Sequence, residues 1–276
     1  MSKSNEGKPH KTQIIQGKTT LPLLYGGGSF ILFLGLLFII KIVRRSRRIA
    51  NFCLAGKHVV ITGGSSGIGK AIASQVLKEG AVVTLVARDE ARLTRASLEL
   101  GGGQKVHIKS LDVGSSMETV GEAMKAVVEE ACQPVEVLIN CAGTSVPGTF
   151  DGLDPAAFEK MMRVNYFGSV YPTRAVVPTM KSNGGGRVVF VSSQAGQIGI
   201  FGFSAYSPSK FALTGLAQVL RMELKPYGIF VSVAYPPDTN TPGFQEENKS
   251  KPEETRLISE TAGLFEPEQV ASNVVS

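Results

Sequence analysis

Tyr206 and Lys210 are the side chains of this 276-residue sequence whose spacing best suits proton transfer. They are four residues apart in the segment AYSPSK, so a helix would place them on one face, one turn apart. A phenol has a reference pKa of about 10 and is a poor proton shuttle at neutral pH. Because a nearby ammonium favours the phenolate, we expect Lys210 to lower the pKa of Tyr206.

Three more polar residues can join this pair. Ser193 lies 13 residues before Tyr206, at the end of a predicted strand, and its hydroxyl can hydrogen-bond a substrate carbonyl oxygen. Its neighbour Ser192 can assist, and Asn165 on a long predicted helix can organise water behind Lys210. Each residue alone has an ordinary structural explanation, but together they indicate a catalytic site.

A glycine-rich turn, TGGSSGIG at residues 62–69, joins the first predicted strand to a helix. Glycine allows tight backbone geometry and close approach to a pyrophosphate, and the helix presents unpaired N–H groups to the anion. A simple connecting turn is the alternative reading, but the strand-turn-helix context favours dinucleotide binding. The expected contacts are Gly63, Ser65, Ser66, Gly67, Ile68 and Gly69.

Arg88 follows the second predicted strand, where an acidic residue would bind the ribose 2′-hydroxyl of NAD. An arginine there suits the 2′-phosphate of NADP, and Arg92 could share that charge. The alternative is a pair of solvated arginines at a helix start. Asp112 and Val113, after the third strand, are placed to meet the adenine. The sequence therefore predicts NADPH as the cofactor.

Strands and helices alternate from residue 56 onward, which predicts right-handed parallel β-α-β units in one doubly wound sheet. Residues 236–265 are rich in Pro, Thr, Asn and Glu, and we expect them to form a mobile loop over the strand ends. The predicted strands are 57–62, 82–87, 106–111, 135–140, 188–191 and 229–235, and the predicted helices are 68–79, 90–100, 115–131, 156–181 and 205–224.

The N-terminal segment has a different composition. Residues 19–40 carry no charge and are long enough to cross a bilayer as a helix. The basic run KIVRRSRR that follows argues against a cleaved signal peptide and favours a cytosolic location for the rest of the chain. We expect a basic tail (1–20), a membrane anchor in the lipid bilayer (21–43), a basic linker (44–55) and a catalytic domain (56–276).

Composition excludes several other classes of protein. The chain is 43% hydrophobic, which rules out wholesale disorder. Residues 1–50 hold nine Lys or Arg and one acidic residue, so residues 51–276 have a net charge of −2 and no evident affinity for nucleic acid. The three Cys and three His are scattered, without the spacing of a disulfide framework or a metal site.

These motifs together resemble the short-chain dehydrogenase/reductase family: TGGSSGIG (62–69), NCAG (140–143), Asn165, Ser193 and Tyr206-x-x-x-Lys210. The resemblance implies a single Rossmann-like domain, a nicotinamide cofactor and a Ser-Tyr-Lys site. It adds Asn140, Ala142, Gly143, Tyr206 and Lys210 to the expected cofactor contacts. Two residues depart from the family pattern: Cys141 stands where Asn is more frequent, and Pro208 lies inside the Tyr-Lys motif.

Residues 164–181, 190–213 and 233–261 resemble more narrowly the family members that reduce long-chain sphingoid ketones with NADPH. That resemblance implies an enzyme of sphingolipid synthesis at the cytosolic face of the endoplasmic reticulum. A membrane-anchored reductase of steroids or retinoids and a catalytically silent binding protein remain alternatives, and oligomeric state stays open. Residues 266–276 look like the start of a helix. Since the family continues beyond such a helix, we expect the last helix and strand to be missing.

Overall fold

The computed structural model describes residues 34–36 and 52–276, and residues Cys53–Ser276 form one compact unit. Residues 34–36 are helical. The predicted tail (1–20), the anchor (21–43) apart from these three residues, and most of the linker (44–55) lie outside the described residues. Within the described ranges, no helix is long and apolar enough to cross a membrane.

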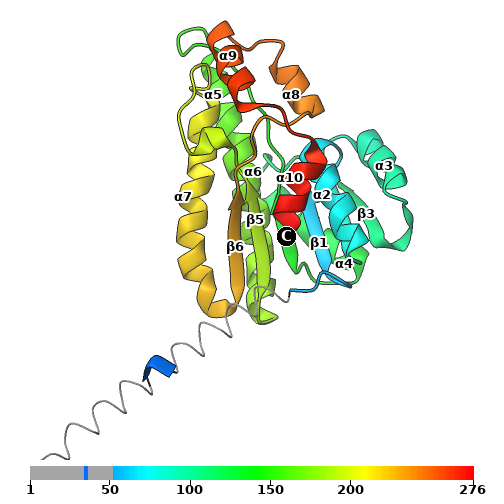
Figure 1. The fold of residues 1–276 in the computed structure, drawn as a ribbon. Helices are drawn as coiled ribbons and strands as arrows, with labels where there is room; N and C mark the ends of the chain where they lie inside the picture. The colour runs from blue at the N-terminus through cyan, green and yellow to red at the C-terminus, as the bar shows by residue number, and fades with distance from the viewer. Residues whose placement is uncertain (1–33, 37–51) are drawn as a thin grey trace, which may run out of the picture. The chain divides into compact units, whose positions relative to one another are not determined.

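A six-stranded parallel sheet forms the centre of the unit, in the order β3-β2-β1-β4-β5-β6 (Figure 1). Every neighbouring pair of strands is parallel. The order reverses direction between β1 and β4, which in such sheets creates a crevice at the carboxyl ends of the strands. The strands are β1 (His58–Thr62), β2 (Val82–Ala87), β3 (Val106–Ser110), β4 (Val137–Asn140), β5 (Gly186–Val191) and β6 (Ile229–Ala234).

Helices cover both faces of this sheet. One core cluster joins alternate residues of the strands, such as Val60, Leu138 and Phe190, to buried residues of three helices. These helices are α4 (Met117–Ala131), α6 (Gly168–Ser182) and α7 (Tyr206–Leu224). Val59 and Ile61 point to the opposite face and are also fully buried. Two helices outside this cluster, α2 (Gly67–Lys78) and α3 (Glu90–Glu99), contact the strands β1, β2 and β3. Helix α10 (Pro267–Val275) packs against α2.

The predicted Rossmann-like fold is confirmed, but two regions differ from the sequence prediction. The helix expected at residues 156–181 is divided into α5 (Pro155–Met161), a π-helical turn (Met162–Phe167) and α6. The loop expected at 236–265 contains two helices, α8 (Pro242–Glu247) and α9 (Glu253–Ala262). In α8, the side chain of Thr241 accepts a hydrogen bond from the N–H of Phe244, which caps the helix.

His58 in β1 is fully buried, and both ring nitrogens have partners. Nδ1 lies 3.0 Å from the carbonyl oxygen of Gln133, and Nε2 lies 2.8 Å from Oγ1 of Thr84. Burial lowers the pKa of the imidazole below its usual value, although the bond to Gln133 opposes this shift. The folded protein therefore holds His58 neutral, while the unfolded chain takes up a proton as the pH falls through about 6.5.

We predict that His58 lowers the free energy of unfolding by up to about 1.4 kcal/mol for each pH unit below about pH 6.5. Urea unfolding of the full chain in detergent, at several pH values, measures this slope. His58→Gln should flatten the slope, whereas His107→Gln, at a less buried position in β3, should change it much less, because His107 contributes only part of the shift at His58. Equal slopes in the two variants would contradict the assignment.

Candidate active site

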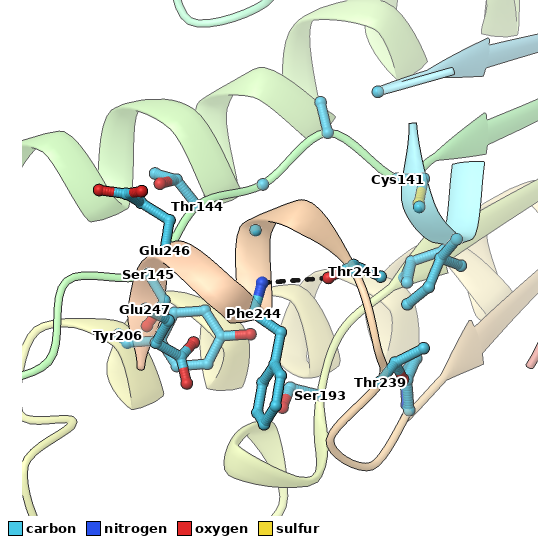
Figure 2. A pocket seen from close by; sticks show the side chains of 18 of the residues that line it. Cys141, Thr144, Ser145, Ser193, Tyr206, Thr239, Thr241, Phe244, Glu246 and Glu247 are labelled. Carbon is cyan, nitrogen blue, oxygen red and sulfur yellow. Dashed lines mark hydrogen bonds between the residues drawn. The ribbon is translucent and has the colours of Figure 1, made fainter. Parts of the chain in front are cut away.

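A cavity of about 1110 Å³ lies at the carboxyl ends of the strands. Its floor is the β1–α2 turn and the loop after β4, and one wall is the start of α7. Residues 236–262, which include α8 and α9, form the opposite wall (Figure 2). The cavity lies at the sheet edge where doubly wound folds bind ligands.

The glycine-rich turn has the geometry of a phosphate cradle. Gly63 has a φ of +70°, and a Cβ there would lie 2.9 Å from the backbone of Ala142. A Cβ on Gly69 would overlap the carbonyl oxygen of Gly63. Helix α2 begins without a side-chain cap and without an acidic residue in its first turn, so its N–H groups suit an anion. The residues present therefore fit a dinucleotide pyrophosphate.

Arg88 and Arg92 lie at the cavity's edge with exposed side chains. Asp89, between them, caps α3 by accepting a hydrogen bond from the N–H of Arg92 at 2.9 Å. Among the described residues, the ion pairs include neither guanidinium. Asp112 and Val113 also line the cavity. Two uncompensated positive charges beside the cradle suit an additional phosphate group.

Tyr206, Lys210 and Ser193 come together in the cavity as the sequence predicted. Nζ of Lys210 lies 5.7 Å from the centre of the Tyr206 ring and donates a hydrogen bond to the carbonyl oxygen of Val191 at 3.0 Å. Ser193 lies beside the Tyr206 hydroxyl in the cavity lining and lowers the pKa of the phenol. Phe203 packs edge-on against the Tyr206 ring, with centroids 5.3 Å apart. Since α7 begins at Tyr206, Pro208 lies in its first turn, where a missing N–H costs nothing.

The predicted shift in the pKa of Tyr206 is wrong in sign. Burial of the phenol raises its pKa above the usual value, and the carboxylates of Glu247 and Asp238 raise it further. The neighbouring side chain of Ser193 lowers the pKa of the phenol and so opposes the shift. Burial also lowers the pKa of Lys210 to about 8. The phenol is therefore fully protonated at neutral pH, which is the state that a proton donor needs.

Three of the predicted site residues support the cavity without exposing a free polar group to it. The hydroxyl of Ser192 donates to the carbonyl oxygen of Lys210 at 3.1 Å. Asn165, in the π-helical turn, does not line the cavity; its amide bonds both the N–H and the carbonyl of Thr144. Asn140 is buried below the cavity, where its side chain donates to Thr173. All the other predicted cofactor residues line the cavity.

The opposite wall contains residues that the sequence did not reveal. Glu247 and Asp238 line the cavity, and both pair with Lys251, whose side chain is fully buried. Ser145, after β4, and Phe244, on α8, also line it (Figure 2). The one signal in the sequence was the spacing of four between Glu247 and Lys251, which is that of a helical ion pair.

Comparison with known proteins agrees with this geometry. The family described as short chain dehydrogenase matches residues 57–252, which include the glycine turn, Ser193, Tyr206 and Lys210. The chain belongs to the short-chain dehydrogenase/reductase family. Within this family, it is 59% identical over 227 residues to a Danio rerio protein named 3-dehydrosphinganine reductase, covering 80% of the chain and 68% of that protein.

Two further members of the family show the breadth of the similarity. A Mus musculus protein named 3-ketodihydrosphingosine reductase is 51% identical over 258 residues, covering 92% of the chain and 76% of the relative. A solved structure of a 3-ketoacyl-(acyl-carrier-protein) reductase from Brucella melitensis, complexed with NADH, is 25% identical. Its TM-score is 0.72, over 80% of the chain and 90% of that structure. The short-chain dehydrogenase/reductase family thus supplies a nicotinamide-binding precedent for the cavity.

Proposed function

We propose that this chain reduces 3-ketodihydrosphingosine to dihydrosphingosine with NADPH, in sphingolipid synthesis. The observation that carries the proposal is 59% and 51% identity to relatives named for this reaction, over 227 and 258 residues of the chain. The geometry adds a protonated phenol, a serine hydroxyl and a buried amine beside a phosphate cradle. These groups suit the reduction of a carbonyl to an alcohol.

The reduction adds a hydride to the carbonyl carbon and a proton to its oxygen. Bound NADPH supplies the hydride, and the glycine turn with the start of α2 would hold its pyrophosphate. Ser193 orients the carbonyl by donating a hydrogen bond to its oxygen. Tyr206, kept protonated by burial, gives its proton to the oxygen as negative charge develops there.

Lys210 and Asn165 keep these groups in place. With a pKa of about 8, Lys210 is mostly an ammonium at neutral pH, and its bond to Val191 holds the positive charge near the phenol. The ammonium favours the phenolate left after proton transfer. Asn165 holds the loop at Thr144 and bonds Ser209 at 2.9 Å, which fixes the first turn of α7 from behind.

The preference for NADPH rests on Arg88 and Arg92. We predict that Arg88→Ala weakens NADPH binding about 10- to 100-fold and NADH binding less than about threefold, because only NADPH carries the 2′-phosphate. Titration of each cofactor by its fluorescence measures both affinities. Arg95→Ala, the matched control, removes an exposed arginine of the following helix, α3, that does not line the cavity. An equal loss for both cofactors would refute the phosphate contact.

The proposed location is the endoplasmic reticulum membrane, with the catalytic domain in the cytosol. The uncharged run at 19–40 and the basic run that follows support an N-terminal anchor of this orientation. An anchored enzyme meets a lipid substrate without extracting its whole chain into water. Protease digestion of sealed microsomes tests the orientation: residues 53–276 should be degraded without detergent. Protection of these residues would place the domain in the lumen.

A substrate panel tests the function. Membranes that contain the full chain should oxidise NADPH with 3-ketodihydrosphingosine and much more slowly with steroid or retinoid ketones. Reduction of a steroid or retinoid alone would favour another anchored reductase. NADPH binding without turnover of any ketone would indicate a catalytically silent binding protein.

A further inference from the structure

Two chemically different sets of side chains line the cavity. The apolar part of the lining includes Val146, Val164, Ile198, Ile200 and Ile258. The other part is polar and lies where α8 faces the start of α7, with Glu247, Asp238 and Ser145 in its lining. A ketone with a long alkyl chain on one side of the carbonyl and a polar group on the other would match both parts.

The polar part has a net negative charge. Nζ of Lys251 lies 2.8 Å from Glu247 and 3.6 Å from Asp238, so one cation faces two carboxylates. Lys251 also donates to the hydroxyl of Ser259 at 3.1 Å, and its Nζ lies 4.3 Å above the Phe244 ring. Its side chain is fully buried, so it fixes the carboxylates without entering the cavity. One negative charge remains uncompensated within this cluster.

Two polar atoms in this part lack a hydrogen bond within residues 34–36 and 52–276. Oδ2 of Asp238 and Oγ of Ser145 are both inaccessible to solvent. The side chain of Glu247 is itself only 12% exposed, and its carboxylate lies beside the Tyr206 ring (Figure 2). A ligand in the cavity therefore reaches the partly exposed carboxylates of Glu247 and Asp238 rather than these two buried atoms.

We propose that Glu247, with Asp238 beside it, determines specificity by binding the protonated amino group next to the keto carbon of the substrate. This inference rests on the proposed function, because 3-ketodihydrosphingosine carries its amine on the carbon adjacent to the carbonyl. When Tyr206 and Ser193 hold the carbonyl oxygen, the ammonium lies one carbon away, on the side of Glu247. The ammonium balances the remaining charge and donates hydrogen bonds to the carboxylates.

The effect of Glu247 and Asp238 on Tyr206 agrees with this assignment. Both carboxylates raise the pKa of the phenol, so without a ligand they oppose any negative charge at the catalytic oxygen. A substrate ammonium offsets their field when the alkoxide forms. A ketone without the amine lacks this compensation, and the site discriminates against it through charge rather than shape.

The test compares amine-bearing and deaminated ligands in the full chain in detergent. Turnover is measured with 3-ketodihydrosphingosine and with its analogue that has hydrogen in place of the amino group. Binding is measured with dihydrosphingosine and its deaminated diol, so that this arm does not depend on catalysis. Glu247→Gln removes the charge but keeps the shape. Glu246→Gln is the matched control, because that carboxylate, although it also borders the cavity, is 73% exposed and pairs with Lys249 rather than Lys251.

We expect Glu247→Gln to lower kcat/KM and affinity for the amine-bearing ligands about 10- to 100-fold and to change the deaminated ligands less than about threefold. Glu246→Gln should leave kcat/KM and affinity unchanged for both the amine-bearing and the deaminated ligands. Equal losses for both ligand types, or equal affinity of the wild type for both, would overturn the proposal. If the wild type reduces neither ketone, the proposed function fails, while the binding arm still decides the ammonium subsite. If Glu247→Gln does not fold, the affinities of the wild type for dihydrosphingosine and for its deaminated diol decide whether the ammonium subsite exists.

Discussion

Replacing Tyr206 with phenylalanine is expected to lower kcat about a thousandfold while leaving NADPH affinity within about twofold of the wild type. The phenol is the protonated group at the centre of the cavity, and burial raises its pKa well above neutrality. Phenylalanine keeps the ring and its edge-on packing with Phe203. The substitution therefore removes the proton source without changing the shape of the site.

Single-turnover and steady-state rates with 3-ketodihydrosphingosine measure this loss, and fluorescence titration measures the cofactor affinity. Tyr235→Phe is the matched control, because its hydroxyl bonds Thr214 and does not line the cavity. That variant should keep nearly full activity. Turnover of Tyr206→Phe above about a tenth of the wild-type rate would contradict its role as proton donor.

The second large effect is expected from Ser193→Ala, which should lower kcat about a hundredfold, the loss typical of one oxyanion donor. The Ser193 hydroxyl lines the cavity beside Tyr206 and accepts a hydrogen bond from the N–H of Ala195 at 3.2 Å. Without it, the carbonyl oxygen loses its orienting donor. The substitution also removes the Ser193 side chain that lowers the pKa of Tyr206.

Ser192→Ala provides the matched comparison for Ser193. The Ser192 hydroxyl is buried and donates to the backbone of Lys210, so its loss should reduce stability by about 1 kcal/mol and leave kcat within about threefold. Steady-state kinetics and thermal unfolding of both variants separate the two roles. The reverse order of kinetic effects would show that Ser192 is the residue that orients the substrate.

The catalytic pair was predictable because it depends on local geometry. A spacing of four on a helix brings Tyr206 and Lys210 together wherever the helix lies, and the start of α7 at Tyr206 accommodates Pro208. The glycine turn was predictable for the same reason, since its conformation is set within eight residues of chain. The alternation of strands and helices then placed both motifs at one edge of the sheet.

The remaining features depend on contacts between distant segments. The opposite sign of the pKa shift at Tyr206 comes from burial of the phenol and from the carboxylates of Glu247 and Asp238, which spacing alone does not reveal. Helices α8 and α9 are short and rich in Glu, and each begins at or directly after a proline, so their sequence resembles that of a loop. The cluster around Lys251 joins the end of β6, α8 and α9, and only the fold brings these together.

Gly67 at the start of α2 has a φ of +53°, and a Cβ there would come within 2.9 Å of the methyl group of Thr241. Thr241 is also the residue that caps α8, the helix that carries Glu247. A side chain at position 67 would thus displace the first turn of the substrate wall as well as strain the phosphate cradle. Attempts to engineer cofactor preference through this turn will therefore also alter which ketones the enzyme accepts.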